Sequence, residues 1–436
     1  MNIKYLIPII NTEIYLIFTL LLFSFGPVEY HLDNPFLFWL CIALYHIGMV
    51  QGYVLGAIPF KRRIVSKKYF KDPSIFKIRV LMFIAFIGFL VMYQNATMSD
   101  SLIPSNLFSN IKTGFLESHI QYTLMDKQFY TGNKLLSIFF FFVAFARIVL
   151  VPVTVFYWEK LGIVDKVLAL AINFLPFLTA LSVGKNKLIF DFVILFAASL
   201  FLYFVASFYR EGKYNFKKRK FFIILTLMFF GLSIWFFGTA MIGRGGDPSY
   251  IESTSPLGHI KIEYAYLSSD QDSILSYTYV WLSSYLVQGY YGFSQSLNVD
   301  FTSTFGLGNS PFLTRQYEWL TGNDISQYTY QHKIDSVWNE TAQWHTLYSQ
   351  IANDIHFLGV VVWNFIIGFY LARLWRSFLD ENNLYAMCLL PLFVMLIIYT
   401  PANNQVFGYL DTFSAFFFLT LLWLGHRYKQ KNIPRN

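Results

Sequence analysis

Apolar runs of about 20 residues recur along most of this chain and constrain its fold more than any other feature. A hydrocarbon core about 30 Å thick needs roughly 20 mainly apolar residues per spanning helix. The runs are rich in Phe, Leu and Ile and do not alternate with period two, which favours helices over outer-membrane barrel strands. Hydrophobic residues make up 56% of the chain and charged residues 13%, whereas soluble domains carry about 25% charged residues. The sequence therefore predicts an all-α polytopic membrane protein.

We predict about ten transmembrane helices, within a range of ten to twelve. The predicted spans are 8–26, 36–60, 79–95, 135–157, 165–183, 187–208, 221–241, 355–374, 385–401 and 405–425. No small-residue cleavage site follows the first run, and Glu13 interrupts it early, so we expect a retained helix rather than a signal peptide. Cys41 and Cys388 both lie inside apolar runs, which excludes a disulfide framework as the organising device.

The distribution of Lys and Arg predicts the orientation. Segments 61–79 and 210–220 and the tail 427–435 are strongly basic, and all three fall on one side of the membrane if the spans are correct. The positive-inside rule makes that side the cytoplasm, with both termini there, in the inner membrane of a bacterium. The net charge of +8 then reflects this bias and not nucleic-acid binding.

The spans divide the chain into three parts. Residues 1–241 are expected to form an N-terminal bundle of about seven helices with a periplasmic loop at 96–134. Residues 242–354 form a long periplasmic loop between the seventh and eighth spans, and 355–436 form the C-terminal helices and a basic cytoplasmic tail. The long loop is dense in Tyr, Trp and Phe, unlike a disordered linker. Within it, 275–297 is a candidate short or re-entrant helix.

Five basic residues on the predicted outer side are candidate anion contacts. Charges inside a membrane are costly and mark function by default, but pairing with an acid is the commonest way they are tolerated. Arg147 is therefore either an anion contact or a structural partner of Glu13 or Asp411. Lys185 and Lys187 suit a phosphate group, or else they snorkel at a helix end, Lys187 with support from Asp191.

The long loop contributes the other two basic residues. Arg244, in GRGGDP, either grips a pyrophosphate or anchors at the interface. Arg315 is the weaker of the two, because a single loop arginine is usually a surface or ion-pair residue.

A second candidate cluster precedes the eighth predicted span. It reads WNETAQWHTLYSQIANDIHF and holds Trp338, Glu340, Trp344, His345 and His356. If this segment is helical, Glu340 and Trp344 share a face with Tyr348. An imidazole or carboxylate there can act as general base toward a sugar hydroxyl, and the indoles can stack on sugar rings. The alternative is an interfacial aromatic belt. Neither a zinc motif nor a nucleotide-binding loop is present, so no metal or other cofactor is expected.

The architecture and several segments resemble Wzy-type O-antigen and capsule polymerases. The segments are SVGKNK, GRGGDP, YLVQGYYGFSQSLNVDFTSTFGLGNSPFL and WHTLYSQIANDIHFLGVVVWNFIIGFYLARLW. The resemblance implies a metal-independent, inverting glycosyltransferase in surface polysaccharide synthesis. It would move a growing glycan from undecaprenyl pyrophosphate onto a new lipid-linked repeat unit at the periplasmic face. A chain-length regulator is the partner protein implied, and the arginines of the long loop, Arg244 and Arg315, are the residues it emphasises.

The chemistry of the residues fits that activity. A pyrophosphate leaving group needs cationic donors, which Lys185, Lys187, Arg244, Arg147 and Arg315 would supply, and His345, Glu340 or His356 would orient or deprotonate the acceptor hydroxyl. An O-antigen ligase or another lipid-linked-sugar glycosyltransferase remains an alternative, as does a polysaccharide flippase. A flippase predicts inverted repeats and broken helices, and neither is evident in the sequence.

Overall fold

The structure is a computed structural model of the 436-residue chain. It describes residues 2–59, 72–97, 99, 101–117, 134–185, 187–212, 216–243, 259–260, 274–340 and 342–431. Helices dominate these residues, and the only strands among them are β1 (Val28–Glu29) and β2 (His259–Ile260), which pair antiparallel. The predicted all-α class is confirmed.

Every predicted span coincides with a helix. These helices are α1 (Ile7–Phe25), α2 (Pro35–Ala57), α3 (Ile75–Thr97), α6 (Lys134–Val143) with α7 (Phe145–Tyr157), α8 (Ile163–Val183), α9 (Lys187–Glu211), α10 (Phe216–Gly243), α16 (Leu347–Glu381), α17 (Leu384–Tyr399) and α18 (Leu410–Lys431). Eight helical stretches in the described residues, from α1 to α16, are long and apolar enough to cross a membrane, while α17 is a shorter apolar helix of 16 residues. The chain is therefore a multi-pass membrane protein, and the number of ten spans stays a prediction.

The segment predicted as a long outer loop has helices of its own where it is described. They are α13 (Ile274–Ser296), α14 (Pro311–Thr321), the short 3-10 helix η3 (Ser326–Tyr328) and α15 (Tyr330–Lys333). The helix expected at 275–297 is confirmed as α13. The helix α16 begins at Leu347 and is interrupted at His356, next to the predicted start of the span at 355. The division into periplasmic and membrane parts stays a prediction.

The chain forms two compact units. Unit 1 contains Met1–Ile64, Gly245–Arg376 and Met395–Tyr409; unit 2 contains Val65–Arg244, Ser377–Val394 and Leu410–Asn436. Each is described by itself below.

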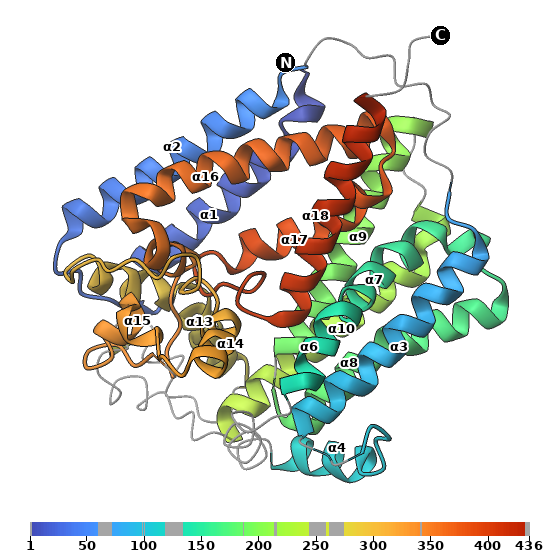
Figure 1. Ribbon diagram of the computed structural model, residues 1–436, viewed down its shortest axis with the longest axis horizontal. Coiled ribbons are helices and arrows are strands. Elements are labelled where there is room, and N and C mark those ends of the chain that lie inside the picture. Colours follow the sequence, from blue (N-terminus) through green and yellow to red (C-terminus); the bar gives the residue numbers. More distant parts are fainter. Residues whose placement is uncertain are drawn as a thin grey trace. The chain divides into compact units, whose positions relative to one another are not determined.

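Unit 1 is built around α1, α2 and α16, which run alongside one another (Figure 1). Three glycines one turn apart on α2 allow its backbone to meet that of α16. A Cβ on Gly48, Gly52 or Gly56 would lie 2.8, 1.9 or 2.6 Å from the carbonyl oxygens of Val361, Phe365 and Phe369 respectively. Small residues at this spacing are a common device for close helix packing in membranes. Because successive glycines along α2 meet successive residues along α16, the two helices run parallel.

Unit 2 contains α3, α4 (Leu107–Leu116), α6 to α10, most of α17, and α18. The helix α7 packs against α3, α8, α9 and α18, so it is the central element of the unit. Three of the described ion pairs lie at the predicted cytoplasmic ends of these helices: Arg79 with Asp165, Lys160 with Asp72, and Arg219 with Glu159. Buried Phe and Leu side chains fill the interior.

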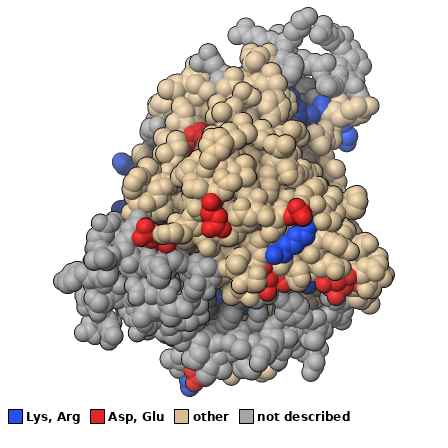
Figure 2. Space-filling view, turned by 90° about the vertical axis from the view of Figure 1, so that its left-hand side faces the viewer, with Lys and Arg blue, Asp and Glu red and all other residues tan. Residues whose placement is uncertain are grey.

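The surface agrees with a membrane environment. Many large apolar side chains on the spanning helices are exposed, among them Ile14, Phe83, Val167 and Leu227, each at least 58% accessible. Figure 2 shows one face on which uncharged residues predominate and most of the visible acidic side chains lie in the lower half. Exposed apolar area of this extent is expected where lipid replaces water around helices.

Candidate functional site

Two helices of unit 2 bring a predicted cation and a carboxylate together. The guanidinium of Arg147 on α7 donates from Nη2 to Oδ2 of Asp411 on α18, and the residues are only 5% and 6% exposed. Asp411 was one of the two partners that the sequence suggested. Glu13, the other, instead pairs with His46 in unit 1, at 2.5 Å between Oε2 and Nδ1. The Nε of Arg147 is buried with no hydrogen-bond acceptor among the described residues.

Lys187 lies close to this ion pair and forms a second one. Its Nζ lies 2.9 Å from Oδ2 of Asp191, a fully buried residue one turn further along α9. Lys187 also interacts electrostatically with Asp411. Two bases and two acids from α7, α9 and α18, separated by up to 264 positions in sequence, therefore form one network near the N-terminal ends of these helices. We call Arg147, Lys187, Asp191 and Asp411 the charge cluster.

The chemistry of the charge cluster follows from its balance. Two formal positive and two formal negative charges cancel, so a bound anion would have to compete with Asp411 and Asp191 for the two bases. Burial strengthens such competition, because electrostatic interactions are stronger away from water. The predicted role of Arg147 and Lys187 as anion contacts is compatible with this geometry and stays a prediction.

The other three basic residues predicted as anion contacts are not part of the charge cluster. Lys185 lies in the turn that ends α8, where Gly184 adopts a positive φ of 64° and the backbone N–H of Lys185 donates to the carbonyl of Ala180 at 3.1 Å. Arg315 is half-buried on α14 in unit 1. Arg244 lies outside the described residues.

The aromatic cluster ahead of α16 is ordered by a hydrogen bond between two predicted site residues. Trp338 is fully buried, and its indole Nε1 donates to the carbonyl of Trp344 at 2.9 Å. Its ring meets Tyr291 of α13 edge-on at 5.0 Å, while Trp344 meets Tyr285 at 5.1 Å. The described residues between 339 and 346 are not helical, so Glu340, Trp344 and Tyr348 do not share a helix face. That conditional expectation is wrong because the segment forms a turn, which brings the Trp338 indole to the carbonyl of Trp344.

His345 is enclosed by this cluster. It is 3% exposed, and neither ring nitrogen has a hydrogen-bond partner among the described residues. Burial lowers the pKa of His345 to about 3, so its imidazole is neutral at physiological pH. A Cβ placed on Gly292 of α13 would lie 3.2 Å from its Nδ1, and one on Gly289 would lie 2.3 Å from the carbonyl oxygen of Pro401. Both glycines are therefore required for α13 to pack this closely.

Glu340 pairs with a residue that sequence reasoning missed. Its Oε1 lies 3.1 Å from Nδ1 of His332 in α15, and both side chains reach solvent, at 29% and 47% exposure. The backbone N–H of Glu340 donates to Oδ1 of Asp335 at 2.8 Å. In the sequence, His332 and Glu340 are eight positions apart. This spacing predicts no side-chain contact in a regular helix, so the pair could not be recognised.

His356 occupies a different setting from the other two catalytic candidates. It interrupts α16 with φ 64° and ψ 161°, a backbone region that is essentially restricted to glycine. Its ring lies edge-on to Phe301 at 5.2 Å, and its Nδ1 accepts from the backbone N–H of Leu358 at 3.3 Å. These contacts indicate a structural role at a break in the helix.

Asp354 and Asn353, just before this break, organise the loop at 303–310. The Asp354 carboxylate accepts five hydrogen bonds: from the Thr304 hydroxyl, the backbone N–H groups of Gly306, Gly308 and Asn309, and the Asn309 amide. Asn353 accepts from the N–H of Tyr330 at 2.8 Å and donates to the carbonyl of Gly308 at 2.8 Å. The Gly-x-Gly of 306–308 thus serves an internal carboxylate and not a phosphate.

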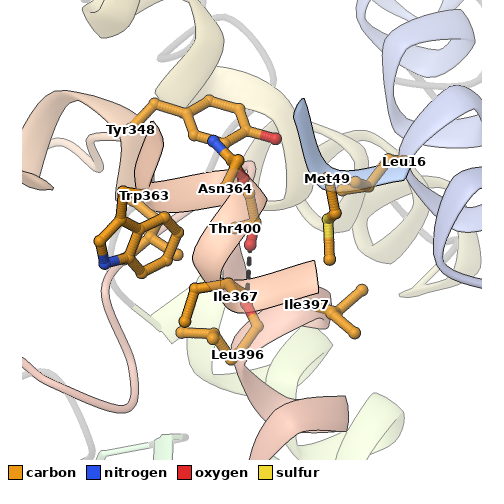
Figure 3. Close-up of a pocket in the computed structure, with 10 residues that line it drawn as sticks. Leu16, Met49, Tyr348, Trp363, Asn364, Ile367, Leu396, Ile397 and Thr400 are labelled. Atoms are coloured by element: carbon orange, nitrogen blue, oxygen red, sulfur yellow. Dashed lines mark hydrogen bonds between the residues drawn. The ribbon is translucent and has the colours of Figure 1, made fainter. Parts of the chain in front are cut away.

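A small cavity lies among helices of unit 1 (Figure 3). Its walls come from α1, α2, α16 and residues 396–400, and its polar lining residues are Tyr348, Asn364 and Thr400. The Thr400 hydroxyl is already bonded to the carbonyl of Leu396 at 2.8 Å. At about 10 Å³ the cavity accommodates at most about one water molecule, so it is not a site for a sugar or a lipid.

Comparison with known proteins returns no relative. No protein-family model, no curated protein and no solved structure matches the chain.

Proposed function

We propose that the protein polymerises oligosaccharide repeat units carried on undecaprenyl pyrophosphate, at the periplasmic face of the inner membrane. The reaction transfers the growing glycan from its lipid pyrophosphate onto a sugar hydroxyl of a new lipid-linked repeat unit. The observation that carries the proposal is the charge cluster, in which Arg147, from the middle of the fourth predicted span, and Lys187, from the predicted outer end of α9, converge on the buried carboxylate of Asp411.

The charge cluster supports the proposal because the reaction releases a pyrophosphate. Negative charge develops on the leaving oxygen, and preorganised cationic donors in a water-poor site stabilise it. The buried Nε–H of Arg147 has no acceptor in the part of the chain that the structure describes, and Lys187 is partly accessible at 24% of its side chain. In the proposed reaction both donors turn from their carboxylates toward the pyrophosphate.

The described part of the outer segment supports binding of sugars. Phe301, Phe305, Trp319 and Tyr328 expose between 38% and 87% of their surface there. Flat aromatic faces with access to water are suited to stack on the apolar faces of sugar rings. We assign the role of general base to Glu340, because its carboxylate is accessible and is held by His332.

The proposal is tested by exchanging the two charges of the buried pair. We compare wild type with Arg147→Asp/Asp411→Arg in membrane vesicles supplied with lipid-linked repeat units, and resolve the products by length on gels. An exchanged pair keeps the ion pair and its neutrality but moves the guanidinium to another helix. We therefore expect at least a 100-fold loss of polymer, which is the usual effect of removing one donor from such a site.

A matched exchange in the same unit serves as the control. Arg79→Asp/Asp165→Arg alters the pair at the predicted cytoplasmic end and should leave polymer length unchanged. Wild-type polymer from the Arg147/Asp411 exchange, with normal protein levels, would reject the charge cluster as the site.

Deletion of the gene in cells, followed by gel profiling of the surface polysaccharide, tests the activity itself. If the protein is a polymerase, the deletion leaves a single capped repeat unit. Loss of all capped glycan would indicate a ligase or flippase, and an unchanged ladder would reject the proposal.

A further inference from the structure

A groove on unit 2 has a lining that differs from both candidate regions above. It has a volume of about 380 Å³ and is bounded by α8, α9 and α10. The lining residues are Leu170, Ala171, Asn173, Phe174, Phe192, Phe196, Phe221, Leu225, Met228 and Phe229. Nine of these ten side chains are apolar, and all belong to helices that are long and apolar enough to span a membrane.

Two lysines flank one end of this groove, one on each of two walls. Lys166 lies one turn before Leu170 on α8, and Lys217 lies one turn before Phe221 on α10. Residues four apart share a helix face, so each lysine continues the stripe of side chains that lines the groove. Both lie at the helix ends that the charge distribution assigns to the cytoplasm. Within the described part of the chain, neither lysine forms a salt bridge.

Trp158 connects the lysine end to the apolar wall. The Nζ of Lys166 lies 5.1 Å from the centre of the Trp158 ring, and that ring stacks on Phe221 at 5.9 Å. Tryptophan prefers the headgroup level of a bilayer, where its ring is apolar and its N–H is hydrated. The order from the bulk side inward is therefore ammonium, indole and hydrocarbon lining, which matches a phospholipid from its headgroup to its chain.

We propose that this groove is a binding site for an anionic phospholipid, with one acyl chain between α8, α9 and α10 and its phosphate between Lys166 and Lys217. Basic pockets between membrane helices on the cytoplasmic side bind anionic headgroups through the same chemistry. The apolar lining accounts for the chain and the two lysines for the preference for negative charge. The site is independent of the polymerase activity proposed above.

The test measures lipid affinity of the delipidated full-length protein in neutral detergent. Phosphatidylglycerol and phosphatidylcholine are titrated separately, and bound lipid is counted by native mass spectrometry. Lys166→Gln/Lys217→Gln should weaken phosphatidylglycerol binding roughly 30-fold and leave phosphatidylcholine binding unchanged. Lys77→Gln/Lys429→Gln removes the same charge from exposed positions on α3 and α18 and should leave both affinities unchanged.

A second pair of variants tests the chain without changing charge. Ala171 is exposed and lines the groove, so Ala171→Trp fills the groove and should reduce phosphatidylglycerol binding at least tenfold. Val167→Trp adds the same bulk at an exposed position on α8 outside the groove and should not. Equal losses from the two lysine pairs, no loss from Ala171→Trp, or displacement of the lipid by millimolar glycerol phosphate would each overturn the proposal.

Discussion

Asp354 holds Asn309 through two hydrogen bonds, one from the Asn309 backbone N–H at 3.1 Å and one from its side-chain amide at 2.7 Å. The same carboxylate also accepts hydrogen bonds from Thr304, Gly306 and Gly308, so it is the principal acceptor that joins the loop to the start of α16, beside the bonds of Asn353. A protonated or shortened side chain at this position cannot accept all five bonds. The loop 303–310 therefore loses five of its hydrogen bonds when this carboxylate is removed.

This dependence predicts the effect of Asp354→Ala. The substitution removes the acceptor that five donors share, and we expect the free energy of unfolding to fall by about 3 kcal/mol. Limited proteolysis should cleave the variant within 303–310 and spare the wild type. Asp324→Ala is the control, because the bonds of Asp324 are confined to the neighbouring residues Ser326 and Gln327. Equal protease resistance of the two variants would contradict the assigned role of Asp354.

The close packing of α2 on α16 predicts strong intolerance at Gly52. A Cβ there would lie 1.9 Å from the carbonyl oxygen of Phe365, so Gly52→Ala must separate two backbones. We expect a loss of about 2 kcal/mol or more, by analogy with overpacking of a close-packed core. Gly231→Ala on α10 meets no atom within 4 Å and should leave stability unchanged or raise it by up to about 1 kcal/mol. Unfolding in mixed detergent micelles measures both, and equal stabilities would refute the close approach.

The burial of His345 predicts an acid-dependent loss of stability. Its pKa falls from 6.5 to about 3 on folding, so the unfolded chain binds the proton more readily than the folded chain between these values. Stability is then fully present above about pH 6.5 and declines as pH falls toward 3. His345→Gln should flatten this part of the profile, whereas His332→Gln, at an exposed histidine, should preserve it. Parallel wild-type and His345→Gln curves of unfolding free energy against pH would refute the prediction.

The pairing of Glu340 with His332 predicts that substitutions at Glu340 reduce activity without reducing stability. Glu340→Gln keeps the shape of the side chain but removes the base, and we expect polymerisation to slow by 100-fold or more with stability nearly unchanged. His332→Gln should slow it less, because the imidazole only positions the carboxylate. Glu318→Gln, at an exposed acid on α14, is the matched control. Full activity of Glu340→Gln in the vesicle assay would remove Glu340 from the reaction.

The helices were predictable from sequence because hydropathy alone determines which runs enter a membrane. The helical turns that precede the break at His356 were not, since half of residues 347–354 (LYSQIAND) are polar. That stretch is helical through tertiary contacts, including the hydrogen bond from the N–H of Leu347 to the carbonyl of Thr400 at 3.0 Å. Local pattern carries no information on such a partner.

The sequence indicated which residues belong to the candidate site better than it indicated which of them pair with one another. Arg147 was recognised as a costly intramembrane charge, and Asp411 was one of two possible partners. The choice between them depended on packing between helices that are 264 positions apart. The enclosure of His345 and the contact between Glu340 and His332 arise from a non-helical turn, which a helical reading of the segment missed.

The glycine face of α2 has a consequence for how the protein is made. Its partner positions on α16 lie 313 residues further along the chain for each glycine (Gly48 with Val361, Gly52 with Phe365, Gly56 with Phe369). During synthesis α2 is therefore in the bilayer long before α16 emerges from the ribosome, and lipid or another helix must cover the glycines in the interval. Completion of unit 1 is thus a late event in biogenesis, set by the arrival of residues 361–369.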